Sequence, residues 1–397
     1  MLVPVADALA RILRLVEPVG TEEVALSQAA GRVLAADAVA TRNQPPFAAS
    51  AMDGYAVRAA DAIAGAKLKL TGEAAAGNGH GGTVGHGEAV RIFTGAPVPD
   101  GADAILIQEN ARREGDTIEV VEAPTAWAYI RPAGMDFAEG FRLTAPRRLT
   151  GPETALLAAM NVARLTVRRR PVVALIPTGD ELVAPGQTPG PDQIVSSNDI
   201  GLAAMLTAAG AQPLCCPIAR DNRDSLLAAL EAAREADFVV TLGGASVGDH
   251  DLVAQVFGDA GLTLNFYQIA MRPGKPLMAG KLANQVMLGL PGNPVSAMVC
   301  GEVFLRPAID AALGLPAGPR TTRTAFLNHD LPANGPREHY MRATVSPAAN
   351  GVMRCEVAGN QDSSLLATLA RADALAVRPP HAPAAKAGSA ISYIPLG

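Results

Sequence analysis

Short apolar runs alternate with helix-like segments between residues 171 and 315, and this alternation constrains the fold more than any other feature. We expect strands in PVVALIP, AQPLCCPI, DFVVTLGG, LTLNFYQIA and QVMLGLPG. We expect helices near 199–209, 222–235, 251–258 and 295–313. Such alternation is typical of a mainly parallel sheet covered by helices. Ligands bind these folds at the carboxyl ends of the strands, where the loops converge.

The last of these strands, at 286–290, leads into a loop suited to an anion. Pro291, Gly292 and Asn293 form a tight turn, and Pro294 stands where a helix would begin. Proline fits the first helical position because the N–H that it lacks would be unpaired there. A glycine turn that opens a helix presents N–H donors to a phosphate. The pattern therefore predicts a phosphorylated, negatively charged substrate.

A second loop of this kind reads GGASVGDHD. Its glycines, Gly243, Gly244 and Gly248, let backbone N–H groups approach a phosphate closely, and Ser246 adds a hydroxyl donor. The loop also carries two carboxylates suited to Mg²⁺, although either one could instead cap the helix that follows; they are Asp249 and Asp251.

Two further loops of this region combine charge with a turn. Glu181, in PTGDEL, could accept a hydrogen bond from a substrate or help to hold a metal ion, and a solvated loop carboxylate is the alternative. The loop MRPGKP places two cations around a rigid turn suited to an oxyanion, with Lys275 as the better candidate and a solvated lysine as the alternative. Its residues are Arg272, Pro273, Gly274 and Lys275.

Residues 46–139 are rich in glycine and short apolar runs, which indicates a small β-rich domain with exposed loops. Asp53, beside Gly54, could cap a turn or coordinate a cation. Thr94, in FTGAP, could bind a ligand or serve as a turn hydroxyl. The glycines of GNGHGG lack the strand and helix of a dinucleotide site, so we interpret that segment as a loop.

The remaining segments complete four expected domains. We predict an amphipathic helix over 4–17 and a helix over 150–162, with Thr150 as its cap and Glu153 three residues later. Residues 316–397 contain short strands. We therefore expect a helical and linker domain (1–45 with 140–170), the β-rich domain (46–139), the α/β domain (171–315) and a C-terminal β domain (316–397).

Composition excludes several classes of protein. The 397 residues are 49% hydrophobic and carry a net charge of −5, which argues against a broad nucleic-acid surface. An anionic substrate then needs local cations, for which the candidates are Arg131, Arg272, Lys275, Lys281, Arg337 and Arg342. No membrane span or signal peptide is expected, and a cytoplasmic location follows by default. Cys215 and Cys216 are expected in the core, and no zinc, P-loop or G-x-S-x-G motif is present.

Six motifs in this order, SAMDGYAVR, TGAPVP, PTGDEL, GGASVGDHD, RPGKP and LPGNPVSA, resemble the MoeA family of molybdopterin molybdenumtransferases, which includes the C-terminal domain of gephyrin. The resemblance implies insertion of molybdenum from molybdate into adenylylated molybdopterin, with release of AMP and help from Mg²⁺. It implies that residues 171–315 are similar to the molybdopterin adenylyltransferase fold. It also implies an elongated homodimer with a site partly supplied by the partner subunit, and contacts with the adenylyltransferase and recipient molybdoenzymes.

The same resemblance assigns roles to individual residues. Catalytic roles fall to Asp53, Glu181, Asp221 and Asp251, of which Asp221 and Asp251 would hold Mg²⁺. Without the resemblance, Asp221 would be interpreted only as a helix cap. Contacts to the substrates fall to Thr94, Ser246, Lys275, Arg337 and Ser363.

Two positions depart from the family pattern. Gln268 stands where a basic residue is usual before MRPGKP, and Met135 replaces the acid in IRPAGMD. These changes keep a second hypothesis open, in which the chain is a molybdopterin-binding carrier or scaffold without catalysis. A third, the adenylyltransferase reaction itself, is disfavoured by the β-rich regions on both sides of the α/β domain.

Overall fold

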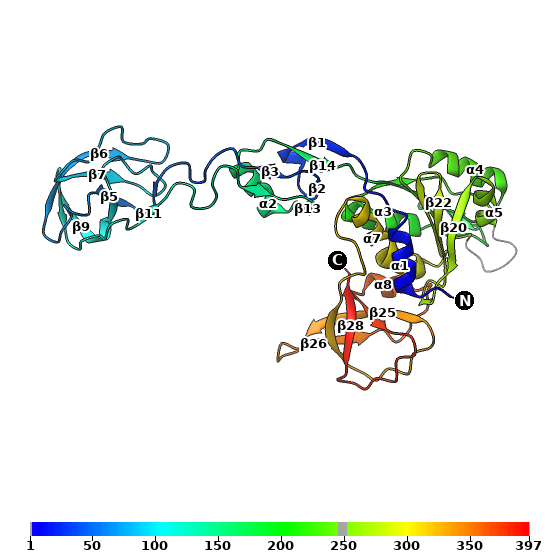
Figure 1. Cartoon of the computed structure of the whole chain (residues 1–397). Coiled ribbons are helices and arrows are strands. Elements are labelled where there is room, and N and C mark those ends of the chain that lie inside the picture. Colours follow the sequence, from blue (N-terminus) through cyan, green and yellow to red (C-terminus); the bar gives the residue numbers. More distant parts are fainter. Residues whose placement is uncertain (1, 245–251, 397) are drawn as a thin grey trace. The chain divides into compact units, whose positions relative to one another are not determined.

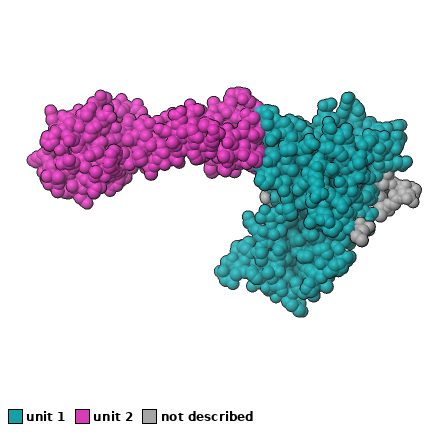
Figure 2. Space-filling model, in the orientation of Figure 1, with its two compact units in different colours: residues 1–22, 168–397 teal, residues 23–167 magenta. Residues whose placement is uncertain are grey.

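The computed structural model describes residues 2–244 and 252–396, and the chain divides into two compact units. The first unit comprises Met1–Glu22 and Arg168–Gly397, and the second comprises Glu23–Val167 (Figure 2). In the described ranges, no helix has both the length and the apolar character needed to cross a bilayer.

The first unit holds the α/β sheet expected from the sequence (Figure 1). Within the described residues the sheet has six strands in the order β18-β15-β19-β23-β22-β20. The parallel strands are β15 (Val172–Pro177), β18 (Gln212–Cys215), β19 (Phe238–Leu242) and β23 (Gln285–Leu290). Two strands extend the sheet: β22 (Pro276–Leu282) pairs antiparallel with β23, and β20 (Leu262–Gln268) pairs antiparallel with β22. The sheet is thus mixed and mainly parallel, and β22 is a strand that the sequence pattern did not reveal.

Helices cover both faces of this sheet. The helices α4 (Arg223–Ala232) and α5 (Leu252–Asp259) pack together on one side and bury Leu226, Val256 and Phe257 against strand residues such as Val239 and Met287. The other helices are α3 (Asn198–Ala209), α6 (Pro294–Cys300) and α7 (Arg306–Ala312), with a π-helical turn at Gly301–Leu305 inside the span expected as one helix. The N-terminal helix α1 (Val5–Leu13) is shorter than expected and packs on α7.

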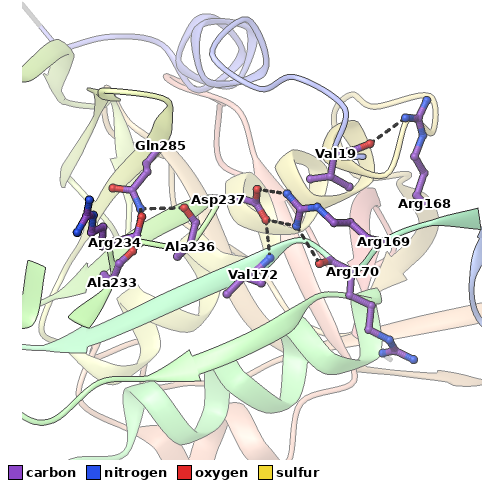
Figure 3. A network of polar contacts seen from close by, with 10 residues as sticks. All are labelled: Val19, Arg168, Arg169, Arg170, Val172, Ala233, Arg234, Ala236, Asp237 and Gln285. Carbon is purple, nitrogen blue, oxygen red and sulfur yellow. Dashed lines mark hydrogen bonds and ion pairs between the residues drawn. The ribbon is translucent and has the colours of Figure 1, made fainter. Parts of the chain in front are cut away.

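An ion pair joins the amino ends of the central strands (Figure 3). Arg169 donates two hydrogen bonds to the carboxylate of Asp237, which also accepts the backbone N–H of Val172 at 2.7 Å. Gln285, at the start of β23, donates to the carbonyls of Ala233 and Ala236 at 2.8 Å. These bonds fix where β15, β19 and β23 begin.

The C-terminal region forms a barrel of five strands in the described part of the chain. They are β24 (Arg323–Leu327), β25 (Glu338–Pro347), β26 (Met353–Val357), β27 (Ala374–Arg378) and β28 (Ala390–Pro395). The barrel closes because β25 pairs with both β26 and β27. A short strand from the α/β region, β21 (Met271–Arg272), pairs with β25, and α8 (Leu366–Ala370) lies outside the barrel strands. The small C-terminal β domain expected from the sequence is therefore confirmed.

The second unit is built mainly from strands. Its largest described sheet contains β5 (Gly54–Val57), β6 (Lys67–Ala74), β7 (Glu88–Ile92), β8 (Ala104–Ile107), β9 (Ala111–Glu114) and β10 (Thr117–Val120). Smaller pairings involve β1 (Thr21–Ala25), β2 (Val33–Leu34), β3 (Ala38–Val39), β4 (Ala49–Ser50), β11 (Ile130–Arg131), β12 (Arg142–Leu143), β13 (Arg147–Arg148) and β14 (Arg164–Arg168). The helix α2 (Gly151–Ala159) begins with the capping box predicted at Thr150 and Glu153.

The cysteine prediction was half right. Cys216 is buried as expected, but Cys215 is exposed, because it is the last residue of β18, which lies at the edge of the sheet.

We predict that Asp237→Asn lowers the free energy of unfolding by about 1–2 kcal/mol, because the amide weakens the contacts with Arg169 and with the N–H of Val172. Urea denaturation measures the change. The exposed pair of Arg223 and Asp259 supplies the control, since Asp259→Asn should cost less than about 0.5 kcal/mol. Equal losses in the two variants would contradict a special role for Asp237.

Candidate functional site

The parallel strands deliver three loops to one edge of the sheet. The N–H of Thr178 donates to the carbonyl of Leu242, and the N–H of Gly243 donates to the carbonyl of Leu290. These two bonds hold the beginnings of the three loops side by side. Gly243 has a φ of +105°, and a Cβ there would lie 2.8 Å from the carbonyl oxygen of Thr178. Only glycine fits this close approach.

A cavity of about 660 Å³ opens at this edge. It brings together Glu181, the turn at 291–294 and Pro276, which follows Lys275 directly. Sequence reasoning missed a further part of its lining, namely Ile194, Val195, Ser196, Ser197, Asn198 and Ser364. A signal for it existed in the polar run SSN before α3, which we did not connect with the other loops.

The turn at 291–294 is held by its surroundings as well as by its own sequence. Asn198 donates from its side chain to the carbonyl of Gly292 at 2.7 Å. Asn293 is the N-cap residue of α6, and Pro294 takes the first helical position as predicted. The next N–H, that of Val295, donates to the carbonyl of Ser363. The N–H of Val295, a donor expected to bind phosphate, is therefore already bonded to Ser363.

The acidic loop around Glu181 is held in place by the side chain of Arg220. Arg220 donates to the carbonyls of Gly179, Asp180 and Leu182 at 3.0–3.3 Å. Gly179 has a φ of +144°, and a Cβ on it would meet the Glu181 carboxylate. This arrangement lets that carboxylate fold back over its own loop.

Asp221 lies beside this loop. Its N–H donates to Asp180 Oδ1 at 3.2 Å. Burial, together with the neighbouring carboxylates of Asp180 and Glu181, raises the pKa of Asp221 above its usual range. In residues 2–244 and 252–396 no three His, Cys, Asp or Glu side chains converge as a complete metal site. Asp251, Ser246 and Gly248 lie outside the described residues.

The basic loop at 271–275 is tied to both the helix layer and the barrel. Gly274, at a φ of +113°, passes so close to Cys300 of α6 that a Cβ would lie 2.6 Å from its Sγ. On the barrel side, β21 pairs with β25 so that Arg272 lies opposite His339. Arg337 donates to the carbonyl of Met271 at 3.5 Å. The structure thus brings Arg337 to the loop that carries Arg272 and Lys275.

Two of the other candidate cations are structural. Arg342 is fully buried and donates to the carbonyls of Asn360, Gln361 and Asp362. It fixes the segment that leads to Ser363. Lys281 donates to the carbonyl of Leu15 at 2.9 Å. Arg342 is buried away from solvent and Lys281 is bonded to a backbone carbonyl, so both side chains have structural contacts that the sequence did not suggest.

Asp53 and Thr94 lie in the second unit. They belong to the loops flanking the paired strands β5 and β7, and Asp53 Oδ1 accepts both the N–H and the hydroxyl of Thr94, at 2.8 and 2.9 Å. Those two bonds lower the pKa of Asp53. Arg91 lies against the rings of Tyr55 and Phe93, with its guanidinium carbon 5.1 and 4.8 Å from their centres. This cation near Asp53 was missed at the sequence level.

We predict that Asp221→Asn raises the melting temperature in metal-free buffer at pH 7. The pKa of Asp221 is raised on folding, so its ionised form is favoured in the unfolded chain and its charge destabilises the fold at neutral pH. Near about pH 3 the wild-type carboxyl is protonated, and the difference should vanish.

Asp224→Asn is the control for this variant. Asp224 lies in the first turn of α4, where the helix dipole favours a negative charge, so its loss should lower the melting temperature slightly. Shifts of the same sign for both variants would contradict the repulsion inferred for Asp221.

We also predict that Thr94→Val raises the pKa of Asp53, because the variant removes the hydroxyl bond and keeps the backbone N–H. Carbon-13 NMR titration of the Asp53 carboxyl measures this, with Asp53→Asn identifying the signal. Thr94→Ser keeps a hydroxyl and should leave the pKa near the wild-type value. An unchanged pKa in Thr94→Val would rule out the hydroxyl contact.

Comparison with known families accounts for three successive parts of the chain. Residues 3–161 match the MoeA N-terminal region (domain I and II), residues 174–311 match a probable molybdopterin binding domain, and residues 324–396 match the MoeA C-terminal region (domain IV).

Similar proteins match over nearly the full length. The molybdopterin molybdenumtransferase of a Nostoc species is 37% identical over 371 residues, which cover 90% of this chain and 85% of the relative. That of Bacillus subtilis is 32% identical over 388 residues, with coverages of 95% and 90%. The crystal structure of a molybdopterin biosynthesis MoeA protein from Pyrococcus horikoshii is similar over the whole of both chains, with a TM-score of 0.85 and 27% identity. The chain therefore belongs to the MoeA family of molybdopterin molybdenumtransferases.

Proposed function

We propose that the enzyme binds adenylylated molybdopterin in the cavity at the carboxyl edge of the sheet, inserts molybdenum from molybdate at the dithiolene and releases AMP with the help of Mg²⁺. The observation that carries this proposal is the convergence of Glu181, the turn at 291–294 and the residue after Lys275 on one cavity. An acidic side chain and the predicted phosphate-binding turn then meet at one site, and the basic loop ends at its wall with Pro276.

The lining of the cavity suits a ring system with a charged end. Ile194 and Val195 are exposed apolar residues of its lining, and they offer apolar contacts to a pterin or adenine ring. Asn198 lies beside them and donates one amide N–H to the carbonyl of Gly292, and its second amide N–H suits the polar edge of such a ring. In the proposed complex, the phosphates lie toward Gly243, Gly244 and the turn at 291–294.

In this proposal Mg²⁺ and molybdate bind to different groups of residues. Asp221 lies near Asp180 and Glu181, and burial, together with the charges of these two carboxylates, raises the pKa of Asp221. We assign Mg²⁺ to Asp221 together with Asp251, since Mg²⁺ commonly uses one or two carboxylates and substrate phosphate. When bound, Mg²⁺ supplies positive charge that neutralises the phosphoanhydride.

Molybdate is assigned to the cations of the basic loop and its neighbours. The proposed contacts are the side chains of Arg272, Lys275 and Arg337 and the hydroxyl of Ser363. Arg337 is bonded to the carbonyl of Met271 beside the basic loop, and the carbonyl of Ser363 is bonded to the start of α6. Glu181 is proposed to orient the water that cleaves the bond between the AMP phosphate and the pterin phosphate, which yields AMP and free pterin phosphate.

We further propose that the enzyme works as a homodimer, in which the partner subunit supplies Asp53 and Thr94. The two hydrogen bonds from Thr94 hold the Asp53 carboxylate ionised and oriented without any ligand. Delivery of the substrate by a molybdopterin adenylyltransferase, and of the product to recipient molybdoenzymes, completes the proposal.

A single-turnover assay tests the reaction. Purified protein is mixed with adenylylated molybdopterin, molybdate and Mg²⁺, and AMP release and pterin-bound molybdenum are followed. We predict that Glu181→Gln lowers the rate roughly 100-fold or more, that Asp221→Asn does the same at low Mg²⁺, and that EDTA abolishes turnover. Glu231→Gln, an exposed change on α4, should leave the rate unchanged.

The carrier hypothesis makes a different prediction for the same assay. Gln268, which favours it, lies opposite Pro276 in the pairing of β20 with β22, and so adjoins the cavity. A carrier would bind the pterin stoichiometrically and release no AMP. Wild-type activity in both Glu181→Gln and Asp221→Asn would instead show that the catalytic residues lie elsewhere.

A further inference from the structure

The segment at 316–322, which we call the barrel linker, connects the helix layer to the C-terminal barrel. It lies between the turn that ends α7 and the first residue of β24, and it contains two prolines, which have no N–H to donate. Within residues 2–244 and 252–396, its backbone forms no hydrogen bond with other backbone groups. The path of the barrel linker therefore depends on side-chain contacts.

Arg320 of the barrel linker supplies such a contact. Its Nε donates to Glu302 Oε1 at 2.8 Å, and its Nη2 lies 2.8 Å from the same oxygen. The side chain of Glu302 is only 7% exposed and that of Arg320 is 20% exposed. Salt in the solvent screens a pair at this depth much less than a pair on the surface. The ion pair therefore ties the barrel linker to the helix layer.

Glu302 is a firm anchor for this contact. It belongs to the π-helical turn at Gly301–Leu305, which packs so closely on α3 that a Cβ on Gly301 would lie 2.6 Å from Leu202 Cδ2. Arg306 Nη1 also donates to the two carboxylate oxygens of Glu302, at 3.2 and 3.4 Å. Because leaving a buried charge unpaired is costly, this second arginine matters: the carboxylate keeps one partner when the other is removed.

Backbone hydrogen bonds attach the barrel to the α/β region at two other places. The N–H of Val295 donates to the carbonyl of Ser363 at 3.1 Å, and the N–H of Glu338 donates to the carbonyl of Ala270 at 2.9 Å, next to the pairing of β21 with β25. Together with the barrel linker, these attachments involve three separate segments of the barrel, so they limit its rotation as well as its position. Arg337 and Ser363, the proposed barrel contacts to molybdate, move with it.

We propose that Arg320 is a positioning residue: through Glu302 it holds the barrel against the α/β region and keeps Arg337 and Ser363 close to the basic loop. Without this contact the barrel linker is free to move and the barrel rotates about its remaining attachments. An anion shared between the barrel and the basic loop is then bound less tightly, because its two sets of contacts no longer keep one geometry. The attachment itself is independent of the proposed function, whereas its effect on molybdate rests on that function.

Hydrogen exchange of the full chain tests the attachment with two matched variants, Arg320→Gln and Arg306→Gln. Each removes one arginine and leaves the other on Glu302, but only Arg320 belongs to the barrel linker. The amides of Val295 and Glu338 report on docking of the barrel, and we expect them to exchange about tenfold faster in Arg320→Gln and near the wild-type rate in Arg306→Gln. The amides between β25 and β27 should stay unchanged in both. Equal exchange in the two variants, or faster exchange throughout the barrel, would overturn the proposal.

The dependence of AMP release on molybdate concentration tests the consequence for the site. We expect Arg320→Gln to raise the KM for molybdate about fivefold while kcat stays within about twofold of the wild type. Arg320→Lys keeps the charge without the planar guanidinium, so it should give intermediate values in both experiments, and it carries the test if Arg320→Gln fails to fold. A loss of kcat at unchanged KM would contradict a positioning role. Failure of the wild-type protein to release AMP would refute the proposed function and leave the exchange result in force.

Discussion

Parallel pairing of β15, β19 and β23 is the constraint on which the rest of the α/β region depends. Parallel neighbours run in one direction, so their carboxyl ends meet at one edge and bring loops from distant parts of the chain together. The register is continuous, with Pro177 opposite Leu242 and Leu242 opposite Leu290. The Arg169–Asp237 pair fixes the opposite edge. A shift of one residue in any of these strands would exchange the side chains packed on its two buried faces and move its loop away from the cavity.

The C-terminal barrel is joined to this edge of the sheet by backbone hydrogen bonds. One connection is the pairing of β21 with β25, and a second is the bond from the N–H of Val295 to the carbonyl of Ser363. The buried guanidinium of Arg342 stiffens the segment before Ser363 by binding three successive carbonyls. Residues of the barrel and of the sheet therefore share one framework, and the cations of the basic loop are held between them.

Electrostatics divides this framework into regions of opposite sign. At the sheet edge Asp221 lies near the carboxylates of Asp180 and Glu181, and in the barrel His339 is buried near the positive charges of Arg272, Arg342, Arg337 and Arg378. The charges of each region stay close together despite their repulsion, because Arg220 and Arg378 donate hydrogen bonds to backbone carbonyls and hold the backbone in place. Imbalances of this kind are typical of places where a charged ligand completes the structure.

The sequence by itself determined the alternating α/β region, the β-rich flanks, the capping box of α2 and the family, because hydrophobic period, turn residues and motif order are local properties. It also gave Pro294 its place at the start of α6. Tertiary structure decided the rest: that β22 is a strand, that Cys215 is exposed, that Arg342 and Lys281 bind carbonyls, and that Ser196, Ser197 and Asn198 line the cavity. These features depend on which distant segment lies opposite each residue. The identity of a side chain determines what it can bind, but only the packing of the fold determines which partner lies within its reach.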